Sequence, residues 1–308
     1  MRLVITGGAG FIGSNLAEEL SKKYEVTVID NLSTGRIENL DQINDKISFI
    51  RGSITDLELL RESFADADTV FHQAAIPSVQ RSVDNPIASN EANIDGTLNV
   101  LVAAKECNVR KVVYASSSSA YGDTPTLPKR EDMKPNPRSP YAVSKLAGEY
   151  YCRVFSDVYG LKTACLRYFN VYGPRQNPES QYAAVIPRFV TRILAHKPPV
   201  IYGDGKQTRD FTFVKDVVKA NILAMESEAE GVFNIACGKR ISLNELAGKI
   251  MEITGIRVDP IYDAPRQGDV RDSLADISDA RRELGYEPSF DLDSGLEGTI
   301  KWFSGELE

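Results

Sequence analysis

The sequence predicts an α/β protein built on a doubly wound parallel sheet, with a smaller α/β lobe attached to it. Short β-rich apolar runs alternate with helical patterns from residue 2 to residue 168. Such alternation is typical of a parallel sheet covered by helices on both faces. A glycine-rich loop at residues 7–13 joins the first strand directly to the first helix, and the alternation loosens from residue 170 onward.

The first part of the chain, residues 1–173, is expected to supply the sheet. Its expected strands cover residues 2–6, 26–29, 47–51, 69–72, 111–115 and 163–168, and its expected helices cover residues 14–20, 55–64, 88–107 and 139–159. Residues 78–82 follow the fourth strand, at the sheet edge where open α/β sheets bind their ligands.

The second part, residues 174–308, is expected to form the smaller lobe. Its expected elements are helices at 183–195 and beginning near 215, 242, 279 and 292, with short strands at 200–202 and 232–236. Ser242 and Glu245 have the spacing of a capping box. We expect the strand at 232–236 to rejoin the sheet, so that a segment near residues 204–237 returns to the first domain. A substrate would then lie between the two parts.

Composition excludes several classes of protein. The chain has 308 residues and a net charge of −7, which argues against a nucleic-acid footprint or a polybasic membrane surface. No apolar run approaches membrane-spanning length, and a strand begins within three residues of Met1, so we expect a cytoplasmic protein without a signal peptide. Two histidines and the scattered cysteines Cys107, Cys152, Cys165 and Cys237 favour neither a metal site nor a disulfide framework.

The loop at residues 7–13 reads GGAGFIG and carries the spacing of a dinucleotide-binding motif at Gly7, Gly10 and Gly13. It follows a strand and opens a helix, whose N-terminus would face a pyrophosphate. Asp30 ends the second strand, where a carboxylate binds ribose hydroxyls and repels a 2′-phosphate. Residues 31–35 contain no arginine. The motif therefore predicts NAD rather than NADP, although a ligand-free glycine turn with Asp30 as a turn former is the alternative.

Two further polar residues allow two interpretations each. Asp56 stands where a helix is expected to begin, so it is either a helix N-cap or a contact to the adenine amino group. His72 ends the fourth strand and is followed by small residues, which favours a packed structural histidine over an acid–base group.

Residues 114–145 hold the candidate catalytic groups. An expected strand runs into four serines at 116–119, and a helix from Ser139 and Pro140 carries Tyr141 and Lys145 one turn apart. A fixed ammonium favours the phenolate form of a nearby tyrosine. A hydroxyl from Ser117 or Ser118 could bind the same substrate oxygen. The spacing thus predicts a Ser-Tyr-Lys proton-transfer site.

Three arginines of the second part, Arg209, Arg266 and Arg271, stand in loops. Guanidinium groups bind phosphate oxygens in pairs, so these residues are candidates for a diphosphate site. The alternative is an ion pair with Asp210, Asp269 or Asp272.

These motifs together resemble the extended short-chain dehydrogenase/reductase family, and within it the UDP-hexose 4-epimerases. The resemblance covers essentially the whole chain and rests on GGAGFIG, Asp30, HQAA, SSSSAYG, SPYAVSK, RYFNVYGPR, TRDFTFVKD and RQGDVRDSLAD. It implies a Rossmann sheet that binds NAD, and a lobe that binds a UDP-sugar. It also implies a homodimer formed by the helix after the Asn93 segment and the helix of Tyr141.

The resemblance further implies residue roles. Tyr141 would be the general base, Lys145 its activator and a ribose contact, and Ser117 the hydroxyl partner with Ser118 close by. The implied NAD-binding residues are Gly7, Gly10, Phe11, Ile12, Gly13, Asp30, Asn31, Ser33, Thr34, Gly35, Ile54, Asp56, Ala74, Ala75, Asn93, Ser116, Tyr141, Lys145 and Tyr168. The implied substrate-binding residues are Ser78, Ser117, Ser118, Tyr141, Asn170, Val185, Val200, Tyr202, Arg209, Arg266, Asp269, Arg271 and Ser273.

Departures from related sequences suggest the sugar. Residues 117–119 contain no acid, which counts against the 4,6-dehydratases and the decarboxylases. Ser273 stands where epimerases restricted to plain hexoses carry a bulky aromatic, so we expect turnover of UDP-GlcNAc and UDP-GalNAc, with UDP-glucose and UDP-galactose as further substrates. The alternatives are a UDP-glucuronate 4-epimerase, with Arg81 or Arg271 binding the carboxylate, and a non-catalytic NAD-sensing protein.

Overall fold

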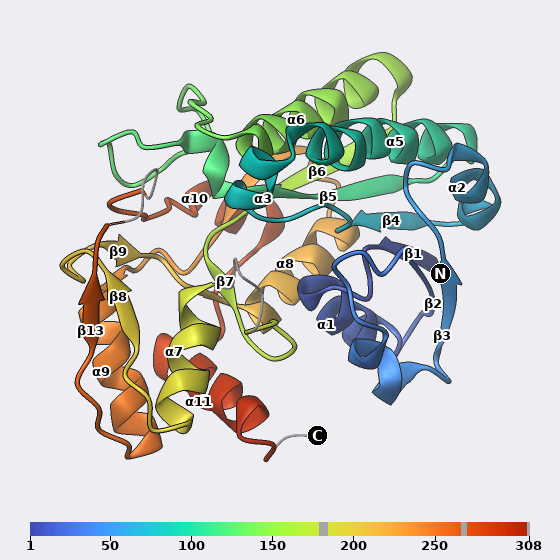
Figure 1. The fold of residues 1–308 in the computed structure, drawn as a ribbon. Coiled ribbons are helices and arrows are strands. Elements are labelled where there is room, and N and C mark those ends of the chain that lie inside the picture. Colours follow the sequence, from blue (N-terminus) through green and yellow to red (C-terminus); the bar gives the residue numbers. More distant parts are fainter. Residues whose placement is uncertain (179–183, 266–269, 307–308) are drawn as a thin grey trace.

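A seven-stranded parallel sheet forms the centre of the computed structural model, which describes residues 1–178, 184–265 and 270–306. The strand order is β11-β6-β5-β4-β1-β2-β3 (Figure 1). The strands are β1 (Arg2–Thr6), β2 (Glu25–Asp30), β3 (Ile47–Arg51), β4 (Thr69–His72), β5 (Lys111–Ser117), β6 (Lys162–Tyr168) and β11 (Gly231–Ile235). The predicted doubly wound fold is therefore confirmed. The order reverses between β1 and β4, so a crevice is expected at their carboxyl ends.

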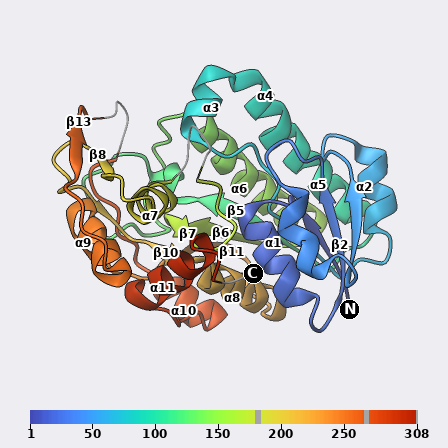
Figure 2. The same ribbon diagram turned by 60° about the horizontal axis from the view of Figure 1, so that its bottom comes forward.

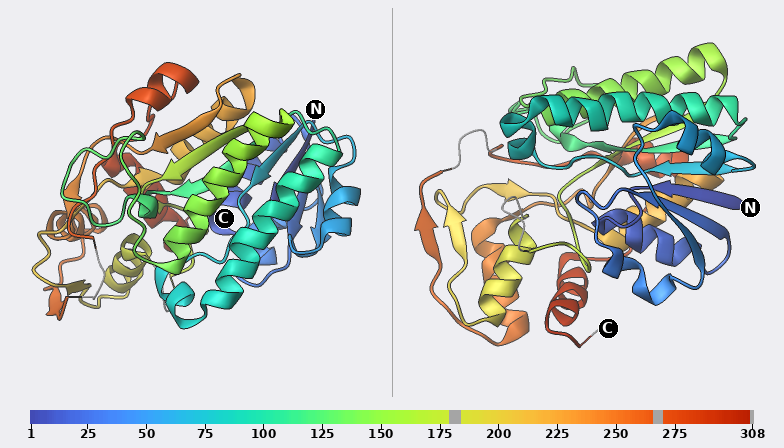
Figure 3. Two further views of the ribbon diagram at one scale, coloured as in Figure 1. Left: turned by 90° about the horizontal axis from the view of Figure 1, so that it is seen from above. Right: turned by 45° about the vertical axis from the view of Figure 1, so that its right-hand side comes forward.

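Helices cover both faces of this sheet, as Figures 1 and 3 show. One face carries α2 (Leu57–Phe64), α5 (Gly96–Glu106) and α6 (Pro140–Tyr159), and the other carries α1 (Phe11–Leu20), α8 (Val214–Glu226) and α10 (Ser278–Leu284). Because the inner strands are buried on both sides, their side chains form two apolar clusters rather than one. This packing holds the strand ends rigidly at one edge.

The long helix expected at residues 88–107 is divided in the structure. Helix α3 (Val79–Asp84) leads into α4 (Pro86–Asn90), a π-helical turn η2 (Glu91–Asp95), and then α5. The π-helical turn places Asn93 in the interior, and a π-bulge is often found at a functional site. Two 3₁₀ segments, η1 (Ile37–Ile43) and η3 (Ser118–Tyr121), follow β2 and β5.

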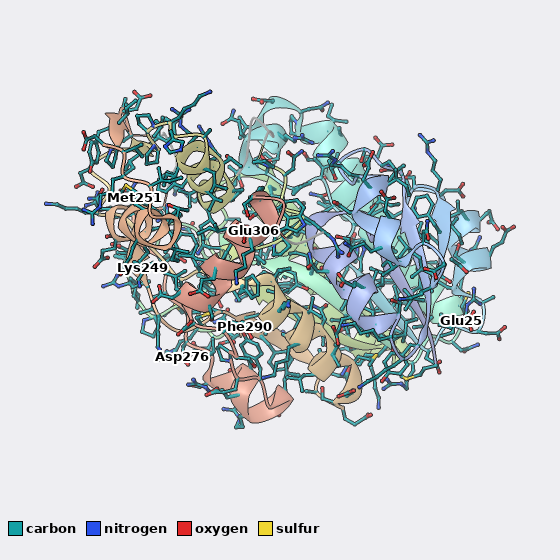
Figure 4. All side chains as sticks on the ribbon, turned by 90° about the horizontal axis from the view of Figure 1, so that it is seen from below. Glu25, Lys249, Met251, Asp276, Phe290 and Glu306 are labelled. Atoms are coloured by element: carbon teal, nitrogen blue, oxygen red, sulfur yellow. The ribbon has the colours of Figure 1, made fainter. Side chains whose placement is uncertain are left out.

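The smaller lobe, which lies beside the sheet in Figure 2, has its own apolar core. Its helices are α7 (Val185–Leu194), α9 (Leu243–Thr254) and α11 (Leu292–Phe303), and its strands are β7 (Val171–Tyr172), β8 (Val200–Tyr202), β9 (Thr208–Arg209), β10 (Thr212–Phe213), β12 (Ile241–Ser242) and β13 (Ile261–Asp263). Phe290, labelled in Figure 4, packs its ring 5.0 Å from that of Phe213 and so fastens the loop before α11.

The chain returns to the sheet after entering the lobe. Strand β11 pairs in parallel with β6, and α8 packs against α1 and the sheet. The predicted capping box of Ser242 and Glu245 is present at the start of α9. A domain boundary near residue 173 stays a prediction. Within the described ranges, no helix is long and apolar enough to cross a bilayer.

We expect opposite effects on stability from alanine at two helical glycines. A Cβ at Gly13 would lie 2.3 Å from the carbonyl oxygen of Gly7, whereas a Cβ at Gly248 in α9 meets nothing within 4 Å. Gly13→Ala should lower the free energy of unfolding by about 1–3 kcal/mol through overpacking. Gly248→Ala should raise it by about 0.5–1 kcal/mol because alanine restricts the unfolded chain. Denaturant titration measures both, and equal effects would contradict this packing.

Candidate functional site

A large cavity of about 640 Å³ opens at the carboxyl ends of the strands. The structure places most of the predicted NAD-binding residues on its wall, namely Gly7, Gly10, Phe11, Ile12, Gly13, Asp30, Asn31, Ser33, Thr34, Ile54, Ala74, Ala75, Ser116, Tyr141, Lys145 and Tyr168. Ser78, predicted to contact substrate, lies on the same wall. The cavity is thus formed by loops from several different strands of the sheet.

The glycine loop forms one end of the large cavity. Gly7 has a φ of +72°, and a Cβ there would lie 2.5 Å from the backbone nitrogen of Ala74. Gly10 is the N-cap of α1 and has no side chain to satisfy the first N–H groups of the helix. Unsatisfied N–H groups at a helix N-terminus bind anions. The loop therefore fits a pyrophosphate such as that of NAD.

Asp30 lies at the end of β2, where it is only 8% exposed. Its carboxylate accepts hydrogen bonds from the backbone nitrogens of Leu32 (2.8 Å) and Ala9 (3.0 Å). Burial raises the pKa of Asp30, and these two hydrogen bonds oppose the rise. Gly35 lies behind the carboxylate rather than on the cavity wall, since a Cβ there would come within 2.9 Å of Asp30 Oδ2.

Sequence reasoning missed a group of polar residues on the wall: Arg36, Asn39, Gln73, Arg175, Gln176 and Asn177. Arg81, named above as a candidate for a sugar carboxylate, lies on the same wall. The Arg36 backbone nitrogen and the Asn39 side chain both donate to the carbonyl oxygen of Ala9, which draws η1 against the glycine loop. Arg36 directly follows residues 31–35, the segment after Asp30 that contains no arginine, so including one more residue of the sequence would have revealed it. Arg175 forms an ion pair with Glu18 (2.7 Å).

Besides Gly35, two further predicted NAD-binding residues lie off the wall of the large cavity. Asp56 is the N-cap of α2 and accepts a hydrogen bond from the nitrogen of Leu59 (3.1 Å). Asn93 is buried, where its side chain accepts from the nitrogen of Ile76 (2.7 Å) and donates to Ser144 Oγ (3.1 Å). Asn93 therefore holds the loop after β4, which itself lines the cavity.

Helix α6 positions the candidate base. Ser139 caps its N-terminus by accepting from the nitrogen of Ala142 (3.1 Å). Tyr141 and Lys145 follow in the first turns, and Lys145 Nζ donates to the carbonyl oxygen of Ala115 (2.8 Å). Tyr141 is hydrogen-bonded to the side chain of Ser117. The structure thus brings Ser117, Tyr141 and Lys145 together, whereas Ser118 begins η3 and lines neither cavity described here.

Burial has opposite effects on the two titratable groups of this triad. It raises the pKa of the Tyr141 phenol, and the hydrogen bond with Ser117 opposes that rise. It lowers the pKa of the Lys145 ammonium to about 8. The net direction for Tyr141 is upward, whereas the sequence predicted a phenolate favoured by Lys145. The physical reason is that Lys145 directs its ammonium to Ala115 and that desolvation outweighs the other influences.

His72 is structural, as favoured from the sequence. Its ring nitrogens are hydrogen-bonded to Thr6 Oγ1 (2.7 Å) and Thr97 Oγ1 (2.9 Å). Burial, followed by the charge of Lys145, lowers the pKa of His72 to about 3. Burial therefore favours the neutral imidazole, and both of its ring nitrogens are engaged by threonine hydroxyls.

A small cavity of about 280 Å³ lies in the lobe. Its wall holds five predicted substrate residues, Asn170, Val185, Val200, Tyr202 and Arg209. Polar and aromatic residues that sequence reasoning missed, Arg188, Gln207 and Phe211, also line it. Ala184 lines both cavities, so the two lie next to each other.

The remaining predicted substrate residues lie beside the small cavity or beyond the described residues. Ser273 Oγ accepts a hydrogen bond from the Asn170 side chain (3.3 Å). Arg271 pairs with Asp204 (3.2 Å), which is an ion pair as the alternative expected but with an aspartate that the sequence did not suggest. Arg266 and Asp269 lie outside the described residues.

Asp210, one of the partners considered for Arg271, is buried instead. Its carboxylate accepts hydrogen bonds from the backbone nitrogens of Cys237 (3.0 Å), Gly238 (3.1 Å) and Ala275 (3.2 Å). Burial raises the pKa of Asp210 to about 7, against the effect of these hydrogen bonds. Asp210 therefore ties three loops together next to Asn170, whose side chain donates to its carbonyl oxygen (2.9 Å).

The fold and the two cavities define a class of nucleotide-cofactor enzymes with a second site for a substrate. The profile of the NAD dependent epimerase/dehydratase family matches residues 3–236, and the chain belongs to this family. Within the described ranges, no group of three or more His, Cys, Asp or Glu side chains could hold a metal ion.

Solved structures show the same similarity over the whole chain. A UDP-N-acetylglucosamine 4-epimerase from Methanobrevibacter ruminantium, in complex with UDP-N-acetylmuramic acid, is 43% identical with a TM-score of 0.96 over 99% of each chain. A UDP-glucose 4-epimerase from Thermotoga maritima, with UDP-glucose, is 41% identical with a TM-score of 0.96 over 100% of each chain. A UDP-glucose 4-epimerase from Thermus thermophilus, in complex with NAD, is 37% identical with a TM-score of 0.91 over 100% of each chain.

These comparisons confirm three predictions made from the motifs. They confirm the resemblance to the UDP-sugar 4-epimerases of the extended short-chain dehydrogenase/reductase family. They confirm that the chain is an enzyme, which rules out the alternative of a non-catalytic NAD-sensing protein. They also confirm NAD as the cofactor.

We expect Tyr141→Phe to lower kcat by about 10²–10⁴-fold, because removal of a general base typically costs that factor. NAD binding should stay within a few-fold of wild type. Tyr24→Phe, which removes a hydroxyl just before β2 at the opposite edge of the sheet, should leave kcat unchanged. Turnover and NAD titration measure both, and near-wild-type turnover by Tyr141→Phe would refute the assignment of the base.

Proposed function

We propose that the enzyme interconverts UDP-GlcNAc and UDP-GalNAc, with UDP-glucose and UDP-galactose as further substrates. The observation that carries this proposal is the small side chain of Ser273, which is hydrogen-bonded to Asn170, a residue on the wall of the small cavity. A serine leaves room for an acetamido group where a large aromatic side chain would not.

The reaction inverts the hydroxyl group at C4 of the hexose. Tyr141, as phenolate, takes the proton of the 4-hydroxyl, and Ser117 holds the same oxygen by a hydrogen bond. When bound, NAD⁺ supplies the hydride acceptor at C4 and later the hydride donor to the opposite face. Tyr141 then returns its proton to the new hydroxyl. Burial raises the pKa of Tyr141, and the hydrogen bond with Ser117 together with a buried positive charge on Lys145 one helical turn away opposes that rise.

Residues on the two cavity walls support binding of both the dinucleotide and the UDP-sugar. The N-terminus of α1, Asp30 and the loop after β4 would hold the dinucleotide. Val200 and Tyr202 would flank the uracil ring, and Arg209 with Asn170 would bind the diphosphate. Guanidinium groups suit phosphate because two of their N–H donors match two of its oxygens.

The alternative of a UDP-glucuronate 4-epimerase needs a cation for the C6 carboxylate. The guanidinium of Arg271 already pairs with Asp204, which argues against Arg271 as the partner of the sugar carboxylate. Arg81 lines the large cavity near Ser78 and is the remaining candidate. The proposed test therefore includes UDP-glucuronate as a third substrate.

We propose that two copies of the chain associate through α6 and the neighbouring α3 and α4. Helix α6 exposes Tyr150, Val154 and Val158, and the adjacent helices expose Val83 and Ile87, which is 79% exposed. Contiguous exposed apolar side chains of this kind mark an interface. Helices α3, α4 and α6 pack against one another, and α6 lies on the outside of the molecule (Figure 3).

Product analysis with UDP-GlcNAc, UDP-glucose and UDP-glucuronate tests the sugar. Ser273→Tyr should lower activity on the N-acetylated pair by about 10²-fold through steric exclusion, with activity on the plain pair changed only a few-fold. Ser273→Ala is the matched control because it loses the hydrogen bond to Asn170 but keeps the space. A wild-type enzyme inactive on UDP-GlcNAc, or equal losses on both pairs in Ser273→Tyr, would contradict the assignment.

Sedimentation velocity tests the association. Val154→Glu together with Val158→Glu should convert a dimer into a monomer, since buried unpaired carboxylates oppose association. Ile261→Glu places a carboxylate on β13, where the isoleucine is 48% exposed on another part of the surface, and should leave the dimer intact. A monomeric wild type would refute the proposed interface.

A further inference from the structure

A fully buried ion pair lies behind the candidate catalytic residues. Glu149 on α6 and Arg167 on β6 have side chains that are 3% and 4% exposed. Arg167 Nε donates to Glu149 Oε1 (2.8 Å), and Arg167 Nη2 donates to Glu149 Oε2 (2.7 Å). Desolvation of two charges can exceed their mutual attraction, so such a pair is weak evidence for a stabilising role. Its position suggests another purpose.

Ser116 connects this ion pair to the end of β5. Its hydroxyl donates to Glu149 Oε1, and the residue lies on the wall of the large cavity. The neighbours of Ser116 in the chain both contact the triad. The Ala115 carbonyl oxygen accepts from Lys145 Nζ (2.8 Å), and Ser117 is hydrogen-bonded to Tyr141. The ion pair therefore holds the three strand residues that meet α6 in the site.

Arg167 is fixed from its other side by an aromatic ring. Its guanidinium carbon lies 4.6 Å from the centroid of the Tyr121 ring, and the Tyr121 hydroxyl donates to Asn234 Oδ1 (2.8 Å). A side-chain hydrogen bond between Arg167 and Tyr121 accompanies this contact. Arg167 is therefore held by Glu149 on one side and by Tyr121 on the other.

We propose that Glu149 and Arg167 are positioning residues, which fix the end of β5 against α6 and so set the distance between Ser117 and the Tyr141–Lys145 pair. The inference rests on the proposed roles of these three residues in proton transfer. Bidentate geometry suits this purpose because it fixes the orientation of both side chains as well as their distance.

The same pair also adds no net charge next to the triad. The other titratable groups that face this region from the packed elements are His72, Tyr114, Tyr121, Glu131, Cys152 and Cys165. Burial lowers the pKa of His72 to about 3 and raises the pKa values of Tyr114 and Tyr121, so these three are neutral near pH 7. Removal of one partner of the ion pair therefore leaves an unbalanced charge.

The test follows the titration of Tyr141 by tyrosinate absorbance in the NAD-bound enzyme, as the difference from Tyr141→Phe. Glu149→Gln leaves the positive charge of Arg167 unopposed and should shift the titration to lower pH. Arg167→Met leaves the negative charge of Glu149 and should shift it to higher pH. The double variant Glu149→Gln/Arg167→Met should return it close to wild type. In each single variant, kcat should fall by about 10²-fold with little change in KM.

Two further variants separate positioning from stability. Lys111→Met removes a buried cation at the opposite end of β5, where Lys111 Nζ donates to the carbonyl oxygens of Ser227 (2.7 Å) and Ala229 (2.8 Å). It should lower the melting temperature without moving the Tyr141 titration or kcat. Arg167→Lys keeps the charge but loses the bidentate contact, so it should lower kcat without shifting the titration, and it serves if Arg167→Met does not fold.

Unshifted titrations, or shifts in the same direction in Glu149→Gln and Arg167→Met, would overturn the inference. The inference would also be overturned if Glu149→Gln and Arg167→Met lost no more kcat than Lys111→Met does at the same loss of stability. Because the titration needs no sugar, it decides the role of the ion pair even if the wild type turns over none of the proposed substrates. Absence of turnover with all the proposed substrates would refute the proposed function and leave the role of the ion pair to be decided by the titration.

Discussion

The close contact between α6 and β5 is the constraint on which the site depends. A Cβ at Gly148 would lie 2.2 Å from the Tyr114 hydroxyl, so only a glycine lets the helix approach the strand this closely. The Tyr114 hydroxyl donates to the carbonyl oxygen of Lys145 (3.3 Å), and Lys145 Nζ donates to that of Ala115. A wider separation would remove Tyr141 from Ser117 and leave the ammonium without its acceptor. The proton-transfer geometry is therefore a consequence of backbone packing.

Sheet topology brings the rest of the large cavity to the same edge. Strands β1 and β4 are neighbours in the sheet although η1, α2 and two strands separate them in the chain. The glycine loop after β1 and the loop after β4 then meet, and the absence of a Cβ at Gly7 allows Ala74 to lie against it. Asn93 fixes the second loop from behind. Residues far apart in the sequence thus line one large cavity.

How far the sequence predicts the site depends on whether the signal is local. The glycine loop, Asp30 and the Tyr141–Lys145 spacing each lie within one strand–helix unit, and the structure places them on one cavity. Asp56 shows a limit, because a helix N-cap and a ligand carboxylate look the same in sequence. Arg271 shows another, since its partner Asp204 is 67 residues away and a nearer aspartate was named instead. Arg175 reaches the carbonyl oxygen of Ser14 across 161 residues, which no local pattern reveals.

The two cavities are lined by different kinds of side chain, which suits the separate binding of a dinucleotide and of a nucleotide-sugar. The small cavity holds aromatic and cationic side chains such as Tyr202 and Arg209, whereas the large cavity near α6 also has small side chains, Ala115 and Ser116, beside Tyr141 and Lys145. In the proposed reaction the hexose must turn so that both faces of C4 can meet the same hydride carrier. This requires tight binding of the nucleotide and loose binding of the sugar ring. In the proposed mechanism, proton transfer depends on the β5–α6 contact and on the ion pair behind it. The proposed choice of sugar depends instead on residues beside Asn170, so a change at Ser273 is expected to alter the substrate and leave the chemistry intact.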